Sequence, residues 1–283
     1  MKEKIKYNFK NLYDTIQRPE MAILPGHLAF YFLMMLIPFL ALIGSLLTTI
    51  DITSKTVTDI IYENLPDVVA DVVISISKQD TAAVSLWVLL IPTLILASNG
   101  TYSVITVANS IYKVKDENMV KSYIINKIKS FLMLFVLITI FIFLLLIPTF
   151  GNIIFKIIGQ VITNEKIINN VYYIMFNILK YPVTFLLVYI SIKILYLLAP
   201  NIKVKENKVR YGAVIASVLL VVSTIGYSIY IENFSTYETF YGGISSLLIL
   251  MLWIYVVSYV FTLGMALNVT HYKIREKQDI AAW

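Results

Sequence analysis

The sequence has 283 residues, of which 59% are hydrophobic and only 14% are charged, and its mean hydropathy is +0.79. Soluble proteins are about 45–50% apolar and about 25% charged, so this composition excludes a water-soluble globular protein. The chain has no cysteine and only two histidines, His27 and His271. This excludes disulfides, thiolate chemistry and metal centres built from cysteine or from several histidines. We therefore expect no bound metal and no cofactor.

Long uncharged segments dominate the sequence. A helix needs about 20 apolar residues to cross a bilayer, and five uncharged segments are at least that long: 28–50, 81–112, 131–155, 211–231 and 239–270. A further apolar segment is interrupted by Lys180 and Lys193. We therefore predict an all-α membrane protein with a single domain, residues 1–283. Its six transmembrane helices are expected over about 28–50, 84–108, 131–152, 178–199, 211–231 and 243–268.

The distribution of Lys and Arg predicts the orientation of these helices. Seventeen of them lie in the segments at 1–27, 109–130, 200–210 and 269–283, whereas four lie in the segments on the opposite side. Basic segments stay on the cytoplasmic side of a membrane, so both termini are expected in the cytoplasm. The formal net charge of +6 then reflects topology and attraction to anionic headgroups. We expect membrane lipids as partners and no nucleic acid.

Two segments outside the predicted spans have the spacing of amphipathic helices. Near the N-terminus, apolar side chains recur on one helix face: Ile5, Phe9, Leu12, Tyr13 and Ile16. This pattern predicts a helix that lies in the cytoplasmic interface of the membrane. The outer loop at 51–83 is interpreted as two short amphipathic helices separated by Pro66. These helices form either a solvated cap over the bundle or a re-entrant lid.

Small and polar residues mark the second and sixth predicted spans. The second span contains four of them near its middle: Ser98, Asn99, Gly100 and Thr101. Polar groups at mid-membrane often line a translocation path, but small residues also allow helices to pack closely. Hydrocarbon cannot satisfy an amide. We therefore hypothesise a hydrated groove between the two spans, lined by Asn99 and facing Ser258 or Asn268 of the sixth span.

Lys193 is the most deeply placed charge in the predicted spans. It lies seven residues before Pro200, which is roughly 10 Å of helix from the cytoplasmic end. One interpretation is that its side chain extends to the interface. The other is that it binds a phosphate or carboxylate headgroup that crosses the bundle. The sequence leaves both open.

Seven short motifs are spread along the chain: His27–Tyr31, Leu36–Phe39, Ala97–Thr101, Asn109–Tyr112, Ser228–Ile244, Leu252–Tyr255 and Gly264–Asn268. Together they resemble the YihY/BrkB family of bacterial inner-membrane proteins. The motif residues interpreted as structural are Pro38, Tyr241, Gly242, Trp253 and Gly264. The resemblance implies six spans, cytoplasmic termini, the bacterial inner membrane, and translocation of lipids or envelope precursors. Leu36 and Ala266 stand where the family commonly has serine and glutamate, so proton or cation handling by that carboxylate is not expected here.

The family has also carried a ribonuclease label, but the sequence argues against hydrolysis. Phosphodiester cleavage usually needs clustered carboxylates or histidines, and the acids of the predicted cytoplasmic segments are scattered among lysines. No GxxxxGK[ST] nucleotide-binding motif is present. We predict that the protein is not an enzyme but a translocator of lipid or of another amphiphilic envelope component. The alternative is a structural or scaffold membrane protein whose basic loops dock lipids or partners.

Overall fold

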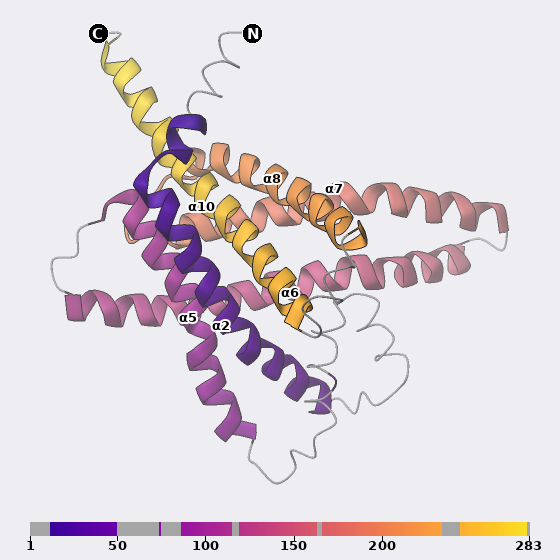
Figure 1. The fold of residues 1–283 in the computed structure, drawn as a ribbon. Helices are drawn as coiled ribbons and strands as arrows, with labels where there is room; N and C mark the ends of the chain where they lie inside the picture. Colours follow the sequence, from indigo (N-terminus) through magenta and orange to yellow (C-terminus); the bar gives the residue numbers. More distant parts are fainter. Residues whose placement is uncertain are drawn as a thin grey trace.

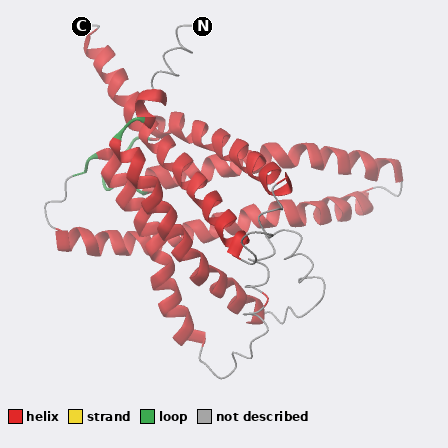
Figure 2. Cartoon of the chain, in the orientation of Figure 1, coloured by secondary structure: helices red, strands yellow, loops and turns green. Residues whose placement is uncertain are grey.

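The computed structural model describes residues 12–49, 74, 86–114, 119–162, 166–233 and 244–281. These residues are mostly helical, with short loops at 17–18, 113–114 and 199–205, and contain no strand (Figures 1 and 2). A helical turn at 12–16 precedes six long helices: α2 (Pro19–Thr49), α5 (Leu86–Tyr112), α6 (Met119–Ile162), α7 (Lys166–Leu198), α8 (Glu206–Asn233) and α10 (Ile244–Ala281). The all-α prediction is confirmed. The predicted amphipathic helices of the 51–83 loop lie outside the described residues except at Ile74, as does the N-terminal segment before Leu12.

Five of these helices contain segments long and apolar enough to cross a membrane: Pro19–Leu36, Ile91–Tyr112, Met119–Ile140, Glu206–Tyr230 and Leu248–Thr270. In α7 the apolar segment is shorter, Pro182–Leu198. The protein is thus a membrane protein with several apolar helices, and the count of six spans stays a prediction. Helix α6 begins at Met119 rather than near 131, because lysine is compatible with a helix and marks only the end of its uncharged part.

Helix α5 ends in a left-handed cap. Lys113 has φ 55°, the N–H of Val114 donates to the carbonyl of Asn109 at 2.9 Å, and the N–H of Lys113 donates to Ser110 at 3.2 Å. This pair of bonds is the Schellman motif. It ends the helix without a glycine and turns the chain toward α6.

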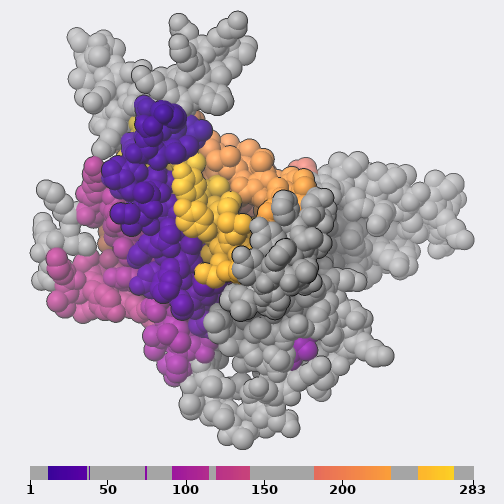
Figure 3. Space-filling model, in the orientation of Figure 1, coloured from indigo at the N-terminus to yellow at the C-terminus, as the bar shows by residue number. Residues whose placement is uncertain are grey.

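Helix α10 is the centre of the bundle. It contacts α2, α5 and α8, while α6 packs against α5 and α7, and α7 packs against α8 (Figure 1). On the face shown in Figure 3, α10 lies between α2 and α8. Every residue of α10 from Val260 to Thr270 is buried, and a helix that is buried all round must be surrounded by other elements. The core of the protein therefore surrounds this part of α10.

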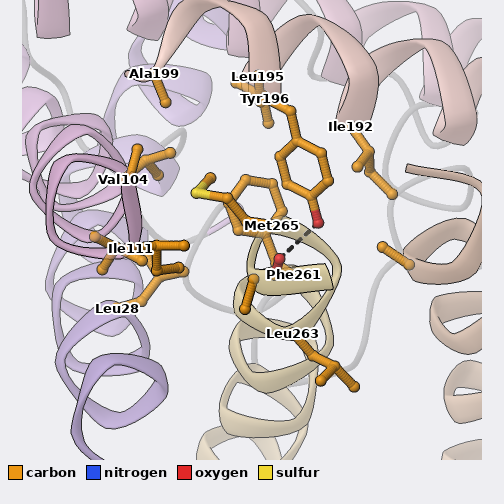
Figure 4. Close-up of a cluster of buried hydrophobic side chains, with 14 of the residues drawn as sticks. Leu28, Val104, Ile111, Ile192, Leu195, Tyr196, Ala199, Phe261, Leu263 and Met265 are labelled. Carbon is orange, nitrogen blue, oxygen red and sulfur yellow. Dashed lines mark hydrogen bonds between the residues drawn. The ribbon is translucent and has the colours of Figure 1, made fainter. Parts of the chain in front are cut away.

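Tyr196 connects α7 to this core. Its side chain is fully buried, its ring lies 4.9 Å from the ring of Phe261, and its hydroxyl donates a 2.6 Å hydrogen bond to the Phe261 carbonyl (Figure 4). Around this pair pack Leu28 of α2, Val104 and Ile111 of α5, and Met265 of α10. The core thus joins residues from distant parts of the sequence.

Small residues bring α8 and α10 into close contact. A Cβ atom added at Gly212 would overlap the Gly264 carbonyl oxygen, and one added at Gly264 would lie 2.7 Å from the Cβ of Ala216. Gly212 and Ala216 are four residues apart on α8, as Gly264 and Asn268 are on α10. Such spacing places small residues on one helix face and is typical of helix packing in membranes.

Candidate functional site

The cluster at 98–101 packs mainly between helices. The Ser98 hydroxyl donates to the Ile95 carbonyl at 2.7 Å, and the Thr101 hydroxyl contacts the carbonyls of Ser98 at 2.9 Å and of Ser130 in α6 at 2.7 Å. Gly100 faces Met35 of α2, which leaves no room for a larger residue. Ser98, Gly100 and Thr101 are buried. These three residues therefore help to pack α5 against α2 and α6.

Asn99 differs from its neighbours because it pairs with a charge. Its amide oxygen accepts a 2.7 Å hydrogen bond from the ammonium of Lys127 in α6. The same ammonium lies 6.0 Å from the ring centre of Tyr102 and 5.7 Å from that of Phe131. Asn99 and Lys127 are both half-buried. This pair, with the two rings, forms a polar site between two apolar helices.

In the structure, Asn99 of the second predicted span does not face the sixth span, as the groove hypothesis expected. Asn99 faces α6, whereas Asn268 of α10 faces α8, where its side-chain oxygen accepts a 2.6 Å hydrogen bond from the N–H of Gly212. Ser258 is fully buried in α10, and its hydroxyl has no hydrogen-bond partner among the described residues. The candidates therefore divide between the α5–α6 contact and the α8–α10 contact. Hydropathy does not specify which way a helix faces about its axis.

Lys193 forms an ion pair rather than lying alone. Its ammonium contacts the Glu206 carboxylate at the start of α8, and Arg210 contacts the same carboxylate at 3.3 Å. The side chain of Glu206 is 56% exposed. The Lys193 ammonium also lies 5.9 Å from the ring centre of Tyr189. This geometry favours the interpretation in which Lys193 extends toward the end of the bundle.

The motif residues interpreted as structural lie in helix contacts where the structure describes them. Pro38 is buried inside α2. Trp253 of α10 is half-buried, with its ring 5.9 Å from that of Tyr227 in α8, and Gly264 makes the close α8 contact described above. Tyr241 and Gly242 lie outside the described residues.

A polar network around Asn201 joins three parts of the chain that the sequence did not connect. Lys129 of α6 donates to the carbonyls of Ala199 and Pro200 at 2.9 and 2.8 Å and to the side-chain oxygen of Asn201 at 3.0 Å. Asn201 donates its backbone N–H to Asn109 of α5 at 2.9 Å and its amide to Asn126 of α6 at 2.7 Å. Lys129 thus satisfies carbonyls at the end of α7, where a cation is also favoured by the helix dipole.

The sequence assigned Lys127 and Lys129 to a basic loop because they lie before the uncharged part of α6. On a helix, Lys127 and Lys129 lie one turn from Ser130 and Asn126, and this spacing could have indicated a polar face. The spacing applies only if the segment is helical, which became clear once α6 was found to begin at Met119. In the part of the chain that the structure describes, no three His, Asp or Glu side chains are grouped so that they could hold a metal ion.

The network belongs to one end of the molecule, where four helix ends meet parts of α6 and α10. Thr15 and Thr270 contact each other through their hydroxyls at 3.2 Å, which places the segment before α2 beside α10. Lys113 after α5 lies 4.0 Å from Glu20 at the start of α2. Together with the Lys129 and Lys193 contacts, these interactions gather the starts of α2 and α8, an early part of α6, the ends of α5 and α7, and the 268–270 region of α10.

Comparisons with known proteins agree with the resemblance seen in the motifs. The model of the family described as "Virulence factor BrkB" matches residues 12–282. The ribonuclease-like protein YfkH of Bacillus subtilis strain 168 is 27% identical over 258 residues, which are 90% of this chain and 91% of that protein. A UPF0761 membrane protein of Photobacterium profundum is 41% identical over 70 residues, 25% of this chain and 22% of that protein. One of Vibrio cholerae is 36% identical over 95 residues, 33% of this chain and 32% of that protein. No solved structure matches the chain.

Proposed function

This chain belongs to the virulence factor BrkB family, and from that premise we propose that it moves the headgroup of an anionic amphiphile between the two leaflets of the bacterial cytoplasmic membrane. The observation that supports this proposal best is the contact of Lys127 with Asn99 between α5 and α6. In this proposal the protein performs no hydrolysis. Lys127 attracts the negative headgroup, and the amide of Asn99 donates a hydrogen bond to it.

The energetics of the pair support a functional role. Lys127 lies four residues before the uncharged part of α6, and its half-buried ammonium contacts Asn99 in the apolar segment Ile91–Tyr112 of α5. A charged group that reaches into an apolar segment often marks a path for ions or substrates. Interhelical hydrogen bonds in membranes contribute only about 0.6 kcal/mol on average. Stability is therefore a weak reason for a charge at this position, and binding is a stronger one.

The proposal includes six spans with both termini in the cytoplasm. The starts of α2 and α8 and the ends of α5 and α7 lie at the same end of the molecule, as they must if each helix crosses the membrane once. The segments at this end carry most of the basic residues, and basic segments stay in the cytoplasm. The α7 segment Pro182–Leu198 would then cross as the shortest span, extended by the residues before Pro182.

Lipid scrambling in vesicles tests the proposal. The purified protein is placed in phosphatidylglycerol vesicles that contain fluorescent phosphatidylglycerol, and a reductant added outside measures how much label reaches the outer leaflet. We expect Lys127→Met and Asn99→Leu to slow scrambling at least tenfold. Lys121→Met removes a more exposed lysine of the same helix and is expected to leave the rate unchanged. No scrambling by the unaltered protein, or an unchanged rate in Lys127→Met, would contradict the proposal.

A scaffold without cargo is the second candidate, and the packing of Ser98 and Thr101 favours it. Accessibility to water separates the two functions. A cysteine introduced at Asn99 should react with a small water-soluble thiol reagent if headgroups pass there, whereas one at the buried Ser98 should not. Leu132, 64% exposed on α6, provides the lipid-facing control. If the cysteine at position 99 is as unreactive as this control, the scaffold function is preferred.

A further inference from the structure

A second polar site lies at the end of the molecule where the helix ends meet, apart from the Lys127–Asn99 pair. It is a cavity of about 160 Å³ between the end of α5, the segment that leads into α8, and α10. Its lining residues are Tyr112, Ile202, Lys203, Val204, Lys208, Asn268 and Val269. This volume suits a small polar group rather than a whole lipid or nucleotide.

Asn268 lines this cavity and has an unused hydrogen-bond donor. Its side chain is only 2% exposed, and its oxygen accepts the N–H of Gly212. Because a backbone N–H can only donate, the atom that faces Gly212 must be the amide oxygen, so the other atom is the NH₂ group. That nitrogen has no hydrogen-bond partner among the described residues. A buried donor left unpaired destabilises the folded state, and a ligand that accepts its hydrogen bond would offset this cost.

Tyr112 provides a second such group. Its hydroxyl is buried and has no hydrogen-bond partner in the described part of the chain. Two of the residues that line this cavity therefore carry a neutral hydrogen-bonding group without a partner in the described part of the chain. Native proteins contain few buried groups of this kind, so two at a single cavity indicate that a polar ligand completes the site.

The charges around the cavity indicate the sign of the charge that this ligand carries. Two lysines, Lys203 and Lys208, are among the lining residues, and no acidic side chain of the described residues is. The cavity also adjoins the start of α8, where the helix dipole favours negative charge. The site is therefore positive and rich in donors.

We propose that this cavity binds a phosphate group. A phosphate offers three acceptor oxygens and up to two negative charges, which match two ammonium groups, a phenol and an amide better than the two oxygens of a carboxylate do. The apolar side chains of Ile202, Val204 and Val269 form the rest of the lining. The phosphate belongs either to a soluble phosphate compound or to a lipid headgroup. The site does not depend on the translocation proposed above, which rests on other residues.

Thermal unfolding of the full-length protein tests this proposal in two arms. In nonionic detergent, inorganic phosphate is titrated against sodium chloride of the same ionic strength. In nanodiscs of phosphatidylcholine, a fraction of the lipid is replaced by phosphatidylglycerol. A ligand that binds only the folded state raises the midpoint of unfolding, and at a given concentration the rise is larger when binding is tighter. A rise with inorganic phosphate indicates that the soluble group suffices, and a rise only with phosphatidylglycerol indicates a lipid headgroup.

Three variants and one matched control make the test specific. Lys203→Gln, Lys208→Gln and Tyr112→Phe each keep the size of the side chain and are expected to weaken binding at least tenfold. Lys205→Gln removes an exposed lysine of the same segment that does not line the cavity, and it should bind as the unaltered protein does. The proposal is overturned if neither arm stabilises the protein beyond the salt control. It is also overturned if Lys205→Gln weakens binding as much as Lys208→Gln.

Discussion

The backbone N–H of Gly212 donates a 2.6 Å hydrogen bond to the side-chain oxygen of Asn268, next to the close contact between Gly212 and Gly264. This bond determines three features at once. It orients α8 on α10, it identifies the Asn268 nitrogen as the unpaired donor, and it holds Asn268 in the lining of the cavity that Lys203 and Lys208 also line. The packing of two helices and the proposed phosphate site therefore share one residue.

Gly212→Ala should destabilise the protein. A Cβ at this position would overlap the Gly264 carbonyl, and such overpacking typically costs about 1–3 kcal/mol. Gly226→Ala in the same helix is the matched control, because a Cβ there would meet no atom within 4 Å. It should be neutral or stabilising by about 0.5–1 kcal/mol. Unfolding in detergent measures both, and equal behaviour of the two variants would show that the α8–α10 contact is looser than described.

Lys129→Met should loosen the connection between α7 and α8. The substitution removes three hydrogen bonds to Ala199, Pro200 and Asn201, and bonds from a charged group contribute about 1.5–3 kcal/mol. Hydrogen exchange at 199–205 should become faster, while exchange in the buried part of α10 changes little. Unchanged exchange at 199–205 would mean that Asn109 and Asn126 hold the segment without Lys129.

Tyr196→Phe separates the contribution of the Tyr196 hydroxyl to stability from that of its ring. The variant keeps the ring contact with Phe261 and loses the 2.6 Å hydrogen bond to its carbonyl. We expect a loss of about 1 kcal/mol, whereas Tyr196→Ala, which leaves a cavity in the core, should cost about 3–5 kcal/mol. Thermal or denaturant unfolding distinguishes the two. Equal losses would assign the whole contribution to the hydroxyl.

Lys193→Leu should be tolerated. Lys193 pairs with Glu206, whose side chain is largely exposed and keeps Arg210 as a second partner, and exposed ion pairs contribute little to stability. Expression, unfolding temperature and lipid scrambling are expected to match those of the unaltered protein. Reduced scrambling with normal expression would instead support the earlier alternative, a headgroup site at Lys193.

Cysteine labelling checks the orientation, since the chain has no native cysteine. A single cysteine at Thr58 or Thr236 should react with an impermeant maleimide on intact cells or spheroplasts, because the charge distribution places those segments outside. One at Asn118 or Asn207 should react only after lysis. The reverse pattern would overturn the predicted orientation.

The sequence by itself determined that the chain is helical and suited to a membrane. Long stretches without charge cannot be covered by polar surface, and in hydrocarbon a helix satisfies its own backbone groups. The predicted spans accordingly fall on α2, α5, α6, α7, α8 and α10. The helix ends were harder to predict, because hydropathy reports where charge begins and not where backbone hydrogen bonding stops. Lys127 and Lys129 were therefore assigned to a loop although they lie within α6.

Only the tertiary structure decided what each helix face meets. The small and polar residues at 98–101 fit a groove or a packed contact equally well in sequence, since both need the same residue types. Asn99 pairs with Lys127, and Asn268 pairs with Gly212, because rotation about each helix axis depends on how all the neighbouring side chains fit together. The cavity at Tyr112 and Asn268 follows from the same cause. Its lining residues come from three regions of the chain, and nothing in their local sequence specifies that they meet.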